Sequence, residues 1–169
     1  MATLKDEKVI DQWYNLIENS AGSGDWILDK VQKYLAEFQA PGVRWRKEPV
    51  KTGLLKGLLG KKRELLLVTN DALKDHKMYV GACDYGKGLS VSWFLTTEPG
   101  YFKKKFSAAL TGNEKALSFA LDLFDQEELR AYVTVSHHAV LEAVQALMEH
   151  RGQDFSKVNT TSKGFLEVW

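Results

Sequence analysis

The side chains best suited to chemistry are Ser136, His137 and His138, together with Cys83, the one thiol of the chain. A serine or cysteine beside a histidine can act as a nucleophile with its general base. Such a serine usually sits in a glycine-rich turn between a strand and a helix, and no glycine flanks Ser136. The segment instead falls within a predicted helix. We expect these polar residues to lie on the surface of a helix, and we predict no catalytic residue. The alternative is a small enzyme in which His137 or His138 acts as the general acid or base.

Two other patterns could hold a metal or a phosphate group. His138 and Glu142 would share a helix face, but two ligands do not complete a metal site and no third is indicated. The stretch 84–88 carries two glycines, as phosphate loops do, yet it joins two predicted strands rather than a strand and a helix. We therefore predict neither a metal nor another cofactor.

A basic, leucine-rich segment is the most informative feature of the sequence. Eight basic residues and one acid, Glu48, lie between Arg44 and Arg63, although the net charge of the whole chain is only +1. Its centre is apolar and holds three glycines, each of which disfavours a helix by about 1 kcal/mol relative to alanine. An apolar loop flanked by lysines is typical of a docking element or a lipid contact. The predicted partner-binding residues are Leu54, Leu55, Lys56, Leu58, Leu59, Lys61, Lys62 and Arg63.

Two further interpretations of the basic residues stay open. The leucines could fold back over the edge of a sheet while the lysines are only solvated. Alternatively, the cations bind an anionic polymer or a membrane surface, either nucleic acid or acidic lipid head groups. A second cluster, residues 101–106, places lysines between aromatics, as in proteins that bind single strands, but Phe102 and Phe106 also suit the buried face of a short helix. The predicted anion-binding residues are Arg44, Arg46, Lys103, Lys104 and Lys105.

The N-terminal elements follow from hydrophobic periodicity. An amphipathic helix is predicted over residues 5–19, whose apolar residues recur at helical spacing: Val9, Ile10, Trp13, Leu16 and Ile17. A second helix is predicted with Asp25 as its N-cap, and Pro41-Gly42 ends it. Together they predict an N-terminal helical hairpin over residues 1–40.

The remaining elements complete an α+β fold. An antiparallel sheet of about four or five strands is predicted over residues 43–97, with Pro49 at an edge position or at the end of its strand and a hairpin around the loop 84–88. Residues 101–169 are predicted to be mainly helical, with a helix after Asn113, a long helix over 126–151 and a possible strand at 164–169. The strand propensity of residues 132–135 leaves a strand plus a helix as the alternative for 126–151.

Composition limits the class of protein. The length of 169 residues suits one domain, and a single cysteine excludes an internal disulfide and indicates a reducing, cytoplasmic compartment. The charged N-terminus has no apolar run behind it, so neither a secretory signal nor a membrane span is predicted. A pI of about 7.8 argues against a dedicated DNA-binding module. We expect a single-domain, non-catalytic interaction protein, a small subunit or adaptor that docks on a protein partner or associates with itself.

Overall fold

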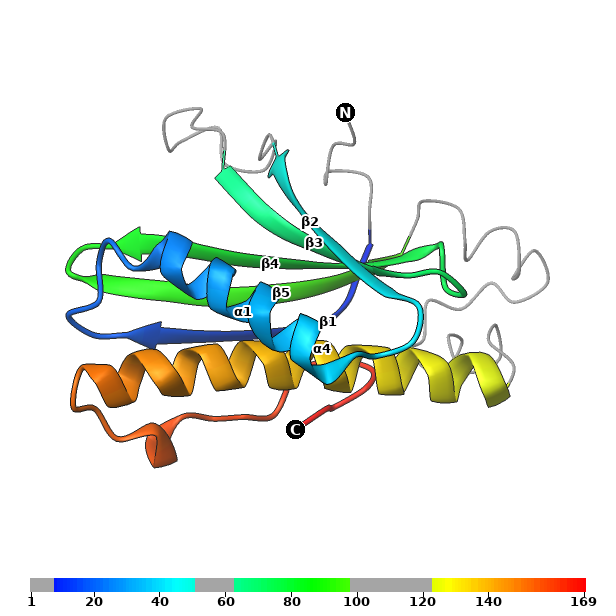
Figure 1. Ribbon diagram of the computed structural model, residues 1–169. Coiled ribbons are helices and arrows are strands. Elements are labelled where there is room, and N and C mark those ends of the chain that lie inside the picture. Colours follow the sequence, from blue (N-terminus) through cyan, green and yellow to red (C-terminus); the bar gives the residue numbers. More distant parts are fainter. Residues whose placement is uncertain (1–7, 51–62, 98–122) are drawn as a thin grey trace.

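The computed structural model describes residues 8–50, 63–97 and 123–169. Its elements are β1 (Lys8–Ile17), α1 (Gly24–Phe38), β2 (Val43–Val50), β3 (Arg63–Asn70), β4 (His76–Tyr85), β5 (Gly88–Thr97), α4 (Leu123–His150) and the 3₁₀ turn η2 (Phe155–Lys157). The strands form one antiparallel five-stranded sheet in the order β1-β5-β4-β3-β2, and α1 and α4 contact each other beside it (Figure 1). The predicted α+β class and antiparallel sheet are confirmed.

The N-terminal segment is a strand, and the predicted helical hairpin is wrong. β1 pairs with β5, with Trp13 opposite Trp93. Trp13 and Ile17 are buried, whereas Val9 and Leu16 are 47% and 52% exposed. Apolar residues on both faces of the strand produce the spacing that resembles a helix. β1 therefore supplies the fifth strand of the sheet, and α1 is the one helix within residues 8–50.

α1 confirms the predicted second helix but not its predicted cap. Its N-cap is Ser23, whose side chain makes no capping hydrogen bond. Asp25 lies in the first turn, where a negative charge is favourable near the positive end of the helix dipole. The residues that α1 buries are Ile27, Leu28, Val31 and Leu35.

α4 is one continuous helix of 28 residues, which confirms the preferred prediction for 126–151. The β-branched and aromatic residues that suggested a strand serve its core face: Tyr132 and Val133 are buried, and the Tyr132 hydroxyl donates to Val68 O at 2.7 Å. None of the helices in the described ranges is long and apolar enough to cross a membrane. The predicted helix after Asn113 lies outside the described residues.

The last residues form no strand, which corrects the prediction for 164–169, but they run along the outer edge of β1. Lys163 N–H donates to Gln12 O at 2.7 Å, and Phe165 N–H donates to Ile10 O at 3.0 Å. Gly164 permits this approach, because a Cβ there would stand 2.6 Å from the backbone of Asp11. We call residues 159–169 the C-terminal segment. It covers the β1 edge of the sheet.

Candidate functional site

β2 is the outermost strand at the other edge of the sheet, and the leucine-rich segment 51–62 joins it to β3. Most of the predicted partner-binding residues therefore lie outside the described residues: Leu54, Leu55, Lys56, Leu58, Leu59, Lys61 and Lys62. Arg63 is the first residue of β3, opposite Val50. What the structure shows of this region is the edge from which the segment leaves.

The main chain of β2 presents its polar groups alternately to β3 and outward. Asp71 N–H donates to Gly42 O at 2.9 Å, so these two residues form a hydrogen-bonded pair. Such pairs alternate along an antiparallel ladder, and the register of β2 with β3 has no shift. The even-numbered residues of β2 therefore bond to β3. The residues whose N–H and C=O positions turn outward are Val43, Trp45, Lys47 and Pro49.

Few donors remain on this edge. The N–H of Val43 is donated to Ala40 O at 3.3 Å, and Pro49 has no N–H to donate. Trp45 and Lys47 thus hold the outward N–H groups of β2, and neither has an acceptor among residues 8–50, 63–97 and 123–169. The predicted edge position of Pro49 is confirmed by the strand order, since a proline removes no ladder bond where its nitrogen faces outward.

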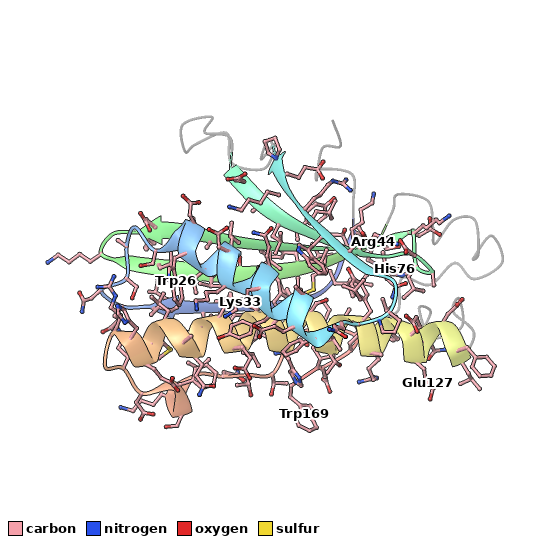
Figure 2. All side chains as sticks on the ribbon, viewed as in Figure 1. Trp26, Lys33, Arg44, His76, Glu127 and Trp169 are labelled. Carbon is pink, nitrogen blue, oxygen red and sulfur yellow. The ribbon has the colours of Figure 1, made fainter. Side chains whose placement is uncertain are left out.

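The charged side chains of β2 are paired with carboxylates of the same chain, and Arg44 is labelled in Figure 2. Arg44 contacts Asp71 through Nε and Nη2 at 3.0 to 3.1 Å. Arg46 Nη2 lies 3.2 Å from Glu48 Oε2, and Lys47 Nζ lies 3.0 Å from Asp29 Oδ1 of α1.

The hydrogen bond between Arg44 and Asp71 raises the pKa of the guanidinium and lowers the pKa of the carboxyl. The edge therefore carries three cations, each beside a carboxylate. Of the predicted anion-binding residues, Arg44 and Arg46 belong to it, while Lys103, Lys104 and Lys105 lie outside the described residues.

His137 is buried, although the sequence predicted a position on the helix surface. Its ring makes edge contacts with Trp13 and Trp93, with centroids 5.6 and 5.5 Å away. Trp93 Nε1–H donates to His137 Nδ1 at 2.9 Å. An indole nitrogen can only donate, so Nδ1 is the acceptor and the proton resides on Nε2, which donates to Thr160 O at 2.6 Å. Both ring nitrogens are thus engaged, and the ring is neutral.

This network holds the C-terminal segment against the core. Trp13 Nε1–H donates to Asn159 O at 2.7 Å, one residue before the carbonyl that His137 binds. Desolvation lowers the pKa of His137 to about 4, which keeps the imidazole neutral at pH 7. The sequence shows the two tryptophans and the histidine, but no local pattern in it indicates that they contact one another. The cluster is structural.

In the described part of the chain, the candidate catalytic side chains do not meet at one place. Ser136 is buried and donates to Tyr132 O, while His138 is exposed as predicted, with Nε2 2.8 Å from Trp169 O. Cys83 follows Ala82, which packs on the core, so strand alternation turns the thiol to the face of the sheet opposite His137. No described group of three histidine, cysteine, aspartate or glutamate residues could hold a metal ion.

The structure also contains a groove lined by both polar and apolar residues, which no pattern in the sequence indicated. A hollow of about 770 Å³ lies where the end of β1 meets the end of α4 and η2, and a second hollow of about 260 Å³ shares Asn15 and Lys157 with it. The larger hollow places Arg151 and Lys157 beside Glu18 and Asp154, so it has no preference for one sign of charge. Its residues come from separated segments, and no local motif marks it.

Comparisons of this chain with protein-family models, with curated proteins and with solved structures found no match. A functional assignment therefore rests on the geometry of the two sheet edges and on the chemistry of the side chains around them.

Proposed function

We propose that this chain is a non-catalytic interaction protein, a small cytoplasmic subunit or adaptor that docks on a protein partner or associates with itself. The docking region consists of the β2 edge and the apolar-basic segment 51–63. One observation carries this proposal: the segment leaves from an outermost strand whose outward N–H groups at Trp45 and Lys47 have no acceptor within the described ranges. An unpaired strand edge is a template for pairing with another chain.

The leucines supply the energy for docking, and the charges supply the selectivity. Full burial of one leucine side chain contributes about 1.5–3 kcal/mol, whereas an exposed ion pair contributes about 0–1 kcal/mol. Four leucines at an interface thus outweigh the ion pairs that Arg44 and Arg46 make, because these two side chains are 73% and 67% exposed.

Binding to nucleic acid or acidic lipid head groups is the alternative proposal. Its basic residues on β2 are already paired, Arg44 with Asp71 and Arg46 with Glu48, so an anion must compete with carboxylates. This weakens the case for the anionic ligand. It predicts an affinity that falls steeply as salt increases, because counterion release drives such binding. Association that does not depend on salt excludes it.

The test replaces all four leucines by serine in one variant, L54S/L55S/L58S/L59S. Native mass spectrometry at low and moderate salt measures association, and thermal unfolding measures stability. We expect association to be lost while the melting temperature stays close to that of the unmodified chain. Lys61→Ala/Lys62→Ala keeps the leucines and removes two of the flanking charges, so it should weaken association less than the serine variant does. A large loss of thermal stability in the serine variant would instead show that the leucines belong to the core.

A further inference from the structure

We infer that the partner of the β2 edge is a second copy of this chain. Two β2 strands pair antiparallel across a twofold axis, and the two five-stranded sheets become one continuous sheet. This inference rests on the proposed function and names its partner. It is carried by the positions of the remaining donors and by the order of charges along β2.

The main-chain groups complement each other when Trp45 lies opposite Lys47 of the second copy. The two residues of a hydrogen-bonded antiparallel pair exchange both of their N–H to O=C bonds. The twofold axis repeats the pair, so four main-chain hydrogen bonds form. Every outward N–H of β2 without an acceptor in the described chain then has one.

The same register also pairs the two outward positions of β2 that have no free N–H group. Val43 faces Pro49 of the second copy. The N–H of Val43 is already donated to Ala40 O, and a proline has no N–H. The pairing therefore ends at both sides without leaving a donor unsatisfied.

The order of charges favours this register over one of its two neighbours. On the face of β2 turned away from α1, Arg44 lies opposite Glu48 of the second copy, and the axis repeats this pair. Arg46 meets its own counterpart at the axis, where Glu48 of its own strand, 3.2 Å away, compensates it. A shift of two residues in one direction sets Arg44 opposite Arg46 twice. A shift in the other direction sets Lys47, which Asp29 compensates, opposite Lys47 at the axis and Arg46 opposite Glu48 twice, so its balance of charges equals that of the inferred register. Only in the inferred register does Arg44 face Glu48. Like charges directly opposite each other destabilise a strand pair.

The outward N–H of Lys47 provides the sharpest test. Lys47→Pro removes this donor but no bond to β3, and proline is tolerated on an edge strand. Lys47→Ala loses the same side chain and its contact with Asp29 but keeps the N–H. The dimer contains two such donors, each worth about 1 kcal/mol, so the dimer dissociation constant of Lys47→Pro should rise about 30-fold above that of Lys47→Ala. Sedimentation equilibrium measures both constants.

A charge exchange tests the register even if the proline variant fails to fold. Arg44→Glu alone and Glu48→Arg alone each place like charges opposite each other twice per dimer, and each should weaken association about tenfold. The double variant R44E/E48R restores opposite charges across the axis and should associate nearly as well as the unmodified chain. Thermal unfolding of all three variants shows that the monomer is intact.

The outcomes separate this inference from the proposed function. Equal dissociation constants for Lys47→Pro and Lys47→Ala, with association still lost in the four-leucine variant, would overturn the β2 pairing and leave the proposed function standing. A monomer across the whole concentration range would also overturn the inference, and docking would then require a different protein. No rescue in R44E/E48R would show that the register is wrong.

Discussion

The outer edges of β1 and β2 differ in what covers their main-chain hydrogen-bonding groups. The edge of β1 receives main-chain hydrogen bonds from Lys163 and Phe165. The edge of β2 instead ends in three charged side chains paired with carboxylates and in one proline. Charges and proline on an edge are common protection against unwanted pairing. A covered edge cannot pair with a further strand. A charged edge can still pair with a strand whose charges are complementary to its own.

The β1 edge is covered by contacts that are mostly buried. Leu166 and Val168 are 2% and 3% exposed. Leu166 N–H donates to the buried Asp11 carboxylate at 2.8 Å, and Arg130 Nη1 of α4 donates to Leu166 O at 2.7 Å. The C-terminal segment therefore links β1 to α4. It stabilises the fold itself, and that is the role we expect the β2 edge to lack.

The largest effect is expected from removing residues 160–169. Full burial of an aliphatic side chain is worth about 1.5–3 kcal/mol, so loss of Leu166 and Val168 alone should lower the free energy of unfolding by about 3–6 kcal/mol. Urea denaturation measures this change. Removal of Trp169 alone is the control, because its side chain is 77% exposed and points away from α4 (Figure 2). Equal stability of the long truncation and the full chain would show that the β1 edge needs no cover.

A smaller effect is expected from acid. His137 has its pKa lowered from 6.5 to about 4 in the folded chain, so the unfolded chain binds the additional proton between these values. Stability is therefore full above pH 6.5 and falls as the pH decreases toward 4, by about 3 kcal/mol in total. Urea denaturation at a series of pH values measures the slope. His137→Gln should lower the stability at pH 7 and flatten the slope over this range. An unchanged slope in that variant would contradict the buried, neutral imidazole.

The sequence predicted β2 to β5 better than β1. The strands β2 to β5 were recognised from local signals, which are alternation in β2 and apolar or β-branched runs beside turn residues in the others. Pro49 indicated an edge or a strand end because its missing N–H is a property of one residue. β1 was mistaken for a helix since Val9 and Leu16 are apolar but exposed, so burial alternates while hydrophobicity does not. Periodicity reports which residues are apolar, and only the paired strand shows which of them are buried.

The buried cluster shows a second limit. His137 was placed on the helix surface because histidine and serine at adjacent positions are commonly solvated. Its burial depends on Trp93, which is 44 residues away, and on Thr160, which is 23 residues away. Neither separation leaves a local signal. The charges, leucines and proline of the proposed docking region lie together in the sequence, whereas the cover of the other edge joins residues from both ends of the chain.

The smallest change in stability is expected at β2, from Arg44→Ala. The Arg44–Asp71 pair has side-chain exposures of 73% and 55%, so solvent screens it, and its loss should stay within the error of a urea titration. Asp71→Ala is the matched control, since it breaks the same pair from the other side. The two variants should nevertheless differ in sedimentation equilibrium, because only Arg44 faces Glu48 of the second copy in the inferred dimer. Weaker association in Arg44→Ala but not in Asp71→Ala would assign the β2 charges to recognition. A clear loss of stability in both would make them part of the fold, as the C-terminal segment is at β1.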